Sequence, residues 1–202
     1  MKRLVLASNN PGKLKEIRVL LAPLAIEVVA QAELGIGEAE EPHHTFLENA
    51  LAKARHASAA AGLPALADDS GICVDALGGE PGVHSAYYAG REGGREVRDA
   101  RNNARLLEAL QNLADRRAHY YCVLVLLRSA GDPQPVVVEG AWHGEIARAA
   151  RGAGGFGYDP LFLVPGTGRT AAELAAEEKN RVSHRGRALA ALVARLRNED
   201  RA

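Results

Sequence analysis

The sequence predicts a mixed α/β fold, and three observations lead to that class. The run Arg3 to Ser8 is a short apolar strand that stops at Asn10-Pro11, where a helix can begin. Two longer β-rich runs, 119–128 and 136–147, flank a turn containing Gly and Pro and predict an antiparallel hairpin. With 202 residues, 47% of them hydrophobic, the chain can bury one substantial core. We therefore expect one domain, residues 1–202.

The charge balance and the cysteine usage narrow the classes of protein to which this chain can belong. The 25 basic and 25 acidic residues cancel, which argues against a general basic surface for nucleic acid or membrane. Cys73 and Cys122 lie in apolar runs without CxxC spacing, so we interpret both as core residues of a protein in a reducing compartment. The first apolar run is too short for a signal peptide or a membrane span. We expect a cytoplasmic protein with neither nucleic acid nor membrane as a partner.

The first helix carries a cation where its dipole disfavours one. Asn10 is a suitable N-cap and Pro11 suits the first helical position. Lys13 then falls in the first turn, which costs only a few tenths of a kcal/mol if the lysine is solvated. Alternatively, an anion docks on the free backbone N–H groups, and the segment from Ser8 to Lys13 then cradles a phosphate.

An acidic segment follows the second predicted strand, 26–30. It holds Glu40 and Glu41 and ends at Pro42, which is typical of a solvated loop or of a loop that supplies one carboxylate to Mg²⁺. His43 and His44 raise a zinc alternative, but no third ligand has suitable spacing. Next, the capping box 45–48 predicts a helix to about residue 61, stopped by a glycine and a proline.

The segment Leu66-Ala-Asp-Asp-Ser-Gly71 lies between two apolar runs. Local propensity predicts two buried strand pieces interrupted by a turn, because Asp and Ser bond their own backbone and Gly allows positive φ. A turn of this kind needs no function. The functional alternative is that Asp68 and Asp69 serve as paired carboxylates.

We expect the middle of the chain to contribute to the fold rather than to a binding site. Residues 76–90 are rich in glycine and predict an ordered loop, and 94–115 predict a helix. This helix carries many arginines but has a leucine stripe, and Arg95 with Asp99 forms an i,i+4 pair. We interpret its outer side as a solvated face of mixed charge rather than as a nucleic-acid surface.

The last third contains a glycine-rich loop and a terminal helix. The loop, 151–160, matches no phosphate-binding fingerprint, so it is either a linker or a device that presents Phe156 for stacking on a base. Ser183 is a plausible N-cap for a helix to about residue 198. Arg185 is predicted to point inward with Leu189, so it needs an anion, either an internal acid or a bound polyanion.

Five motifs together resemble one family, the inosine triphosphate pyrophosphatases, and particularly its bacterial dITP/XTP branch. They span nearly the whole chain and are Ser8-Asn-Asn-Pro-Gly-Lys13, Thr45-Phe-Leu-Glu-Asn-Ala50, Leu66-Ala-Asp-Asp-Ser-Gly71, Gly154-Gly-Phe-Gly-Tyr-Asp-Pro160 and Ser183-His-Arg-Gly186. Pro42-His43-His44 departs from the family, in which a small residue is expected there.

The resemblance implies an elongated central sheet, two lobes around an active-site cleft, a homodimer and Mg²⁺. It implies that Asp69 is the catalytic carboxylate and a metal ligand, together with Glu40 in preference to Glu41. Asp68 would be the partner of Asp69, and Lys53 a possible helper at the phosphates. The implied substrate contacts are Ser8, Asn9, Asn10, Pro11, Gly12, Lys13, Ser70, Phe156, Gly157, Tyr158, Asp159, Lys179, His184 and Arg185.

The implied activity is hydrolysis of ITP, dITP and XTP to the monophosphate and pyrophosphate, which removes these nucleotides from the pool. One alternative is a Mg²⁺-dependent pyrophosphatase for another modified nucleotide, and a second is a nucleotide- or RNA-binding module without turnover. Asp68-Asp69 argues against the module, because two carboxylates would repel phosphate in the absence of metal.

Overall fold

The computed structural model describes residues 1–199, and its strands form one mixed six-stranded sheet. The strand order is β2-β1-β3-β4-β5-β6. β1 pairs in parallel with β2 and β3, whereas β5 pairs antiparallel with β6. The predicted α/β class is thus confirmed. The strands are β1 Arg3–Leu6, β2 Glu27–Ala30, β3 Ala65–Val74, β4 Arg117–Leu127, β5 Val136–Ile146 and β6 Phe162–Leu163.

The helices begin largely where capping residues predict. Asn10 Oδ1 accepts the N–H groups of Gly12 and Lys13, and Thr45 caps the next long helix by accepting from Glu48 N–H. The α-helices are α1 Pro11–Leu21, α2 Phe46–Ala61, α3 Arg95–Ala109, α4 Ala176–Val182 and α5 His184–Glu199. The short 3₁₀ helices are η1 Ala22–Leu24, η2 Gln31–Leu34, η3 Asp75–Leu77, η4 Gly82–Tyr87 and η5 Ala171–Glu173.

Three local predictions are wrong. The helix predicted over 94–115 ends at Ala109, and the loop predicted over 76–90 contains η3 and η4. More important, β3 runs without interruption through Asp68, Asp69 and Ser70, so the predicted turn does not exist. Local propensity is overridden because both carboxylates are buried against cations from distant segments.

The chain divides into two compact units, each with its own apolar core. Unit 1 comprises 1–69, 122–140 and, among the described residues, 185–199; unit 2 comprises 70–121 and 141–184. Strands β3, β4 and β5 contribute residues to both. The single-domain prediction extends to residue 202, and its last three residues lie outside the described part. The division places every predicted site residue in one unit or the other.

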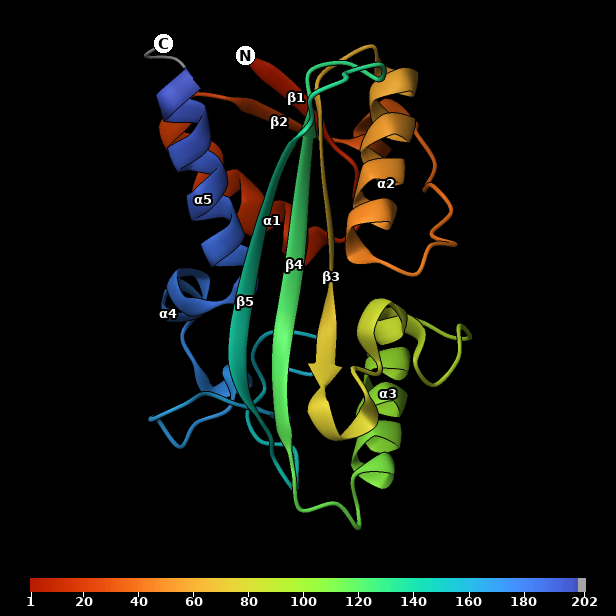
Figure 1. Ribbon diagram of the computed structural model, residues 1–202, viewed down its shortest axis with the longest axis vertical. Helices are drawn as coiled ribbons and strands as arrows, with labels where there is room; N and C mark the ends of the chain where they lie inside the picture. The colour runs from red at the N-terminus through yellow and green to blue at the C-terminus, as the bar shows by residue number, and fades with distance from the viewer. Residues whose placement is uncertain (200–202) are drawn as a thin grey trace. The chain divides into compact units, whose positions relative to one another are not determined.

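In unit 1, helices cover both faces of the strands. α1 and α5 lie on one face and α2 on the other (Figure 1). The core of the α1–α5 face includes Ile17, Leu66, Leu124 and Leu189. Cys122 belongs to this core, and burial raises the pKa of its thiol to about 12, so it stays protonated as a core residue. Both cysteines are free thiols, as predicted.

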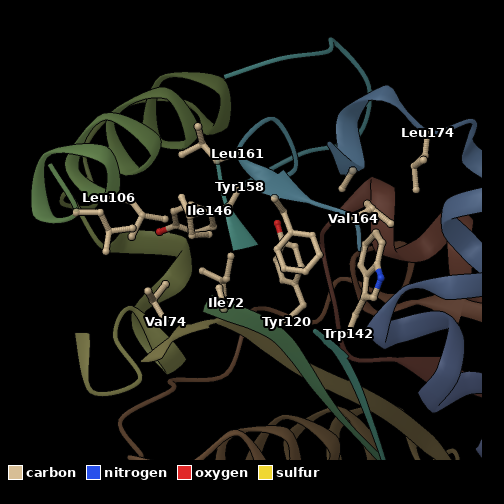
Figure 2. Close-up of a cluster of buried hydrophobic side chains, with 14 residues drawn as sticks. Ile72, Val74, Leu106, Tyr120, Trp142, Ile146, Tyr158, Leu161, Val164 and Leu174 are labelled. Carbon is tan, nitrogen blue, oxygen red and sulfur yellow. The ribbon is translucent and has the colours of Figure 1, made fainter. Parts of the chain in front are cut away.

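Unit 2 is built around aromatic residues of β4, β5 and β6. The ring centroids of Tyr120 and Phe162 are 4.8 Å apart, and those of Trp142 and Phe162 are 4.9 Å apart. Figure 2 shows Tyr120 and Trp142 in this cluster, with Leu106 of α3 also contributing. Tyr120 of this cluster also contacts Asp159 and His184, which are described below.

Candidate functional site

In unit 1, Asp69 lies in a buried ionic group on the α2 face. Its Oδ1 is 2.8 Å from Lys53 Nζ, and Glu41 Oε1 is 3.2 Å from the same ammonium. Asn49, one turn before Lys53 on α2, donates to Asp69 Oδ2 at 3.4 Å. Two carboxylates therefore converge on one cation, although local propensity assigned Asp69 to a turn.

The protonation states of this group are set by burial and by charge. Burial raises the pKa of Asp69, and the Lys53 ammonium opposes that rise without cancelling it. For Lys53, burial acts to lower the pKa, but Asp69 and Glu41 more than offset it, so the ammonium is retained. A carboxylate with a raised pKa beside a fixed cation is suited to accept a proton.

Asp68 lies in a second ionic group, formed with α1 and α5. Its Oδ2 is 3.0 Å from Lys13 Nζ and 3.2 Å from Arg185 Nε, and Arg185 Nη1 donates to Glu16 Oε2 at 2.6 Å. Burial would raise the pKa of Asp68, but Lys13 and Arg185 outweigh it and hold that pKa well below its usual range. The prediction that Arg185 points inward is confirmed, since only 4% of its side chain is exposed.

The segment from Ser8 to Lys13 forms the tight start of α1. Ser8 Oγ accepts the N–H of Asn10, while Asn10 Oδ1 accepts from Gly12 at 3.0 Å and from Lys13 at 3.3 Å. Pro11 is the first residue of the helix, and Asn9 is exposed just before it. Lys13, the cation in the first turn of α1, is paired with the internal Asp68, and Arg185 is likewise paired with internal acids.

In unit 2, Asp159 joins three segments that are far apart in the sequence. Its Oδ2 accepts from Lys179 Nζ at 2.6 Å and from Phe156 N–H at 2.8 Å, and its Oδ1 accepts from the Tyr120 hydroxyl at 3.3 Å. A Cβ on Gly155 would lie 2.0 Å from Asp159 Oδ2, and Gly155 has φ +71°, so only glycine fits there.

His184 completes this group. Its ring stacks on Tyr120 at 4.6 Å with an interplanar angle of 8°, and it is buried. Phe156, Asp159, Lys179 and His184, all predicted to contact substrate, are thus brought together around Tyr120 and α4. Tyr158 differs from its predicted neighbours, because its ring lies in the core cluster and its hydroxyl donates to Ser85 O at 2.9 Å (Figure 2). Ser70 lies on β3 and is partly exposed.

Comparison with known proteins identifies the family. The Ham1 family model matches residues 4–195. The chain belongs to the Ham1 family. This Ham1 family chain is 67% identical over 197 residues to a dITP/XTP pyrophosphatase of Ralstonia nicotianae, with 98% of each chain covered. It is 65% identical to a dITP/XTP pyrophosphatase of Nitrosomonas europaea, covering 97% of this chain and 95% of the other.

A solved structure bears out the fold. The HAM1 protein from Coxiella burnetii matches the Ham1 family chain with a TM-score of 0.91 at 48% identity, covering 98% of this chain and all of the other. Both the recognised family and the predicted fold class are therefore confirmed. Over residues 1–199, no helix of this chain combines the length and the apolar character needed to cross a membrane.

Two contacts of the Ham1 family chain could not have been predicted from its motifs. Asp99 Oδ2 accepts the N–H of Gly157 at 2.9 Å, and Asn103 Nδ2 donates to the carbonyl of Gly157 at 2.8 Å. Both residues lie on α3, which had been interpreted as a solvated face. The one sequence signal is their i,i+4 spacing, which places them on one side of the helix. α3 therefore hydrogen-bonds both backbone polar groups of Gly157, the residue next to Phe156.

The acidic segment of the Ham1 family chain reaches the site through Glu41. Both Glu40 and Glu41 are exposed, and Glu41 contacts Lys53. Asn49 fixes the end of this segment, since its side chain accepts from His43 N–H and donates to His43 O. Within residues 1–199 no three His, Cys, Asp or Glu side chains form a metal cluster. Mg²⁺ needs only one or two protein carboxylates besides substrate oxygens, so the carboxylates of Asp69 and Glu41 fit that ion.

Proposed function

We propose that this chain hydrolyses dITP, XTP and ITP to the nucleoside monophosphate and pyrophosphate. The observation that carries the proposal is its identity of 60–67%, over nearly the full length, to proteins named dITP/XTP pyrophosphatase. The two groups of candidate residues agree with it, since unit 1 offers cations and carboxylates and unit 2 offers an aromatic ring with polar neighbours. A role in removing such nucleotides from the pool follows from the reaction.

In unit 1, we assign the phosphates to the start of α1 and to the cations beside Asp68. Lys13 and Arg185 are oriented by Asp68, which leaves their charge in fixed positions for phosphate oxygens. Ser8, Asn9, Asn10, Pro11 and Gly12 would shape the backbone around the same phosphates. Lys53 would assist by holding Asp69 in place.

Asp69 is the catalytic carboxylate of this proposal. It would orient a water for in-line attack on the α-phosphorus and accept the proton that the water loses. Asp69 with Glu40 or Glu41 would hold Mg²⁺, and the contact of Glu41 with Lys53 favours Glu41. When bound, Mg²⁺ would supply charge neutralisation for the phosphate oxygens.

In unit 2, we assign the base to the group around Asp159. The Phe156 ring would stack on the purine, and Ser70 and the loop residues Gly157 and Tyr158 would border the nucleotide. Lys179 and His184 would contact the edge of the base. A hydrogen-bond donor aimed at O6 is satisfied by a 6-oxo purine and not by a 6-amino purine. Sites built on such buried polar pairs can discriminate by about 10⁴- to 10⁵-fold.

The proposed assembly is a homodimer working in the cytoplasm, an inference from the family resemblance and from cysteine usage. Sedimentation at micromolar concentration tests the first part. A monomer at every concentration would contradict it.

The decisive experiment is to incubate the protein with ITP and Mg²⁺ and to measure pyrophosphate and inosine monophosphate. Equal amounts of both products support the proposal, whereas release of free phosphate alone contradicts attack at the α-phosphorus. A panel with dITP, XTP, ATP, GTP and modified pyrimidine triphosphates separates this function from that of a pyrophosphatase for another nucleotide. EDTA added before substrate should stop turnover while leaving the thermal unfolding midpoint within a few degrees of its original value.

A further inference from the structure

Two cations lie over the ring of Phe156 in unit 2. Arg95 Cζ is 4.6 Å from the ring centroid and Lys179 Nζ is 4.7 Å from it. Two like charges at one ring are best separated on its opposite faces. Each cation takes up ring surface on which a base would stack, so one of them must move when a purine binds to Phe156.

The two cations are held very differently. Lys179 has 9% of its side chain exposed and is 2.6 Å from Asp159. Arg95 has 35% of its side chain exposed, and its Nε is 3.7 Å from Asp99 Oδ2, an oxygen that already accepts the Gly157 N–H at 2.9 Å. Arg95 is therefore the more exposed of the two cations, and we take it as the one that moves.

We propose that Arg95 is a base-binding residue that forms the outer wall of the base site. As the purine enters, the guanidinium leaves Phe156 and stacks on the other face of the base, so that the base lies between Phe156 and Arg95. A guanidinium is planar and delocalised and is only weakly hydrated, so it can exchange one aromatic face for another. This inference rests on the proposed function in taking Phe156 as the base-stacking ring.

Kinetics of two variants test the proposal. Arg95→Ala should raise KM for ITP by about 3-fold or more and leave kcat within about 2-fold, because stacking on a base contributes more than the exposed cation–π contact that the guanidinium gives up on leaving Phe156. Arg95→Lys should give an intermediate KM, because an ammonium keeps the charge but lacks a flat surface. Arg105→Ala is the matched control: Arg105 lies on the same helix, its guanidinium is 4.7 Å from the Tyr88 centroid, and its loss changes the charge equally.

A ligand without a base distinguishes stacking of Arg95 on the base from general attraction of its charge to the phosphates. Inorganic tripolyphosphate should inhibit the wild type and Arg95→Ala with the same Ki. An Arg95→Ala variant whose KM is unchanged or lower, or one that loses tripolyphosphate affinity as much as ITP affinity, overturns the proposal. An equal rise in KM in Arg105→Ala also overturns it.

Binding of inosine monophosphate by calorimetry distinguishes failure of this inference from failure of the proposed function. If ITP yields no pyrophosphate but the monophosphate binds more weakly to Arg95→Ala than to the wild type, the hydrolytic function fails and the Arg95 inference stands. If ITP is hydrolysed and Arg95→Ala binds the monophosphate as tightly as the wild type, only the inference fails. A wild type that binds no inosine nucleotide overturns both.

Discussion

Asp68 and Asp69 are consecutive residues of β3, yet their side chains enter separate ionic groups. Asp68 pairs with Lys13 and Arg185 on the α1–α5 face, and Asp69 pairs with Lys53 on the α2 face. Alternation along an extended strand turns neighbouring side chains to opposite faces, which a turn would not do. The two acids are thereby freed for different tasks, one orienting cations and the other available for chemistry.

Replacing Asp69 with Asn should remove the proton acceptor and leave the fold intact. Turnover of ITP is expected to fall by at least about 100-fold, because a positioned acid or base contributes typically 10²- to 10⁴-fold. Asn is close in size and its amide oxygen still accepts from Lys53. Pyrophosphate release measures the effect, and an unchanged thermal midpoint shows that folding is unaffected. Wild-type turnover in this variant would disprove the role assigned to Asp69.

Replacing Lys53 with Met should leave Asp69 and Glu41 without their shared cation. Removal of one partner of a buried pair costs about 3–5 kcal/mol, so we expect the free energy of unfolding to drop by about 3 kcal/mol. The pKa of Asp69, already raised by burial, should rise further without the opposing ammonium, and the acid limb of the pH–rate profile should move to higher pH. Urea unfolding and the profile are the two measurements.

The matched control for that variant is Lys15→Met, at an exposed position of α1. Its stability should stay within about 0.5 kcal/mol of the wild type. If the acid limb does not move in Lys53→Met, Lys53 does not govern the ionisation of the catalytic group.

Asp68→Asn should destabilise the protein in a pH-dependent manner. The variant leaves Lys13 and Arg185 short of one negative charge, at a cost of about 3–5 kcal/mol at neutral pH. Because the pKa of Asp68 is lowered in the folded state, its stabilisation is complete above the unfolded value of 3.8 and is lost as pH falls below it. The difference in unfolding free energy between wild type and variant should therefore be constant from pH 5 upward, within about 0.5 kcal/mol, and shrink below about pH 4.

Asp75→Asn provides the control, since Asp75 is exposed and its contact with Arg117 is 3.7 Å. A constant difference for Asp68→Asn down to pH 2 would show that its charge is not what stabilises unit 1.

Asn103→Ala should loosen the loop that carries Phe156. The variant loses the bond to the carbonyl of Gly157, worth about 1 kcal/mol, so KM for ITP should rise about 5-fold while kcat changes less. Asn112→Ala, at an exposed position beyond α3, should have no effect. Equal kinetics for Asn103→Ala and wild type would mean that the hydrogen bond from α3 to Gly157 does not position the Phe156 ring.

Much of the fold could be predicted because its signals are local. Asn10, Thr45 and Gly62 set helix ends by contacts within a few residues, and the structure confirms all three. The runs predicted as a hairpin are the neighbouring strands β4 and β5. The inward direction of Arg185 followed from the stripe that it shares with Leu189, and both are buried.

What could not be predicted depends on partners distant in the sequence. The strand character of Asp68 and Asp69 comes from Lys13, Lys53 and Arg185, which no local window includes. The same applies to Asp99 and Asn103, whose loop partner lies more than 50 residues away. Glu41 and Glu40 are equivalent by composition, and only the folded path of the acidic segment distinguishes them.

The internal pairing of Lys13, Lys53 and Arg185 also bears on how a highly charged nucleotide finds this protein. Each cation is already neutralised by a carboxylate of its own chain, and the 25 basic residues are balanced by 25 acidic ones. The field that extends into solvent is consequently weak, so encounter is governed by diffusion rather than by long-range steering. The association rate of substrate should then change little with ionic strength, and charge recognition begins only after contact.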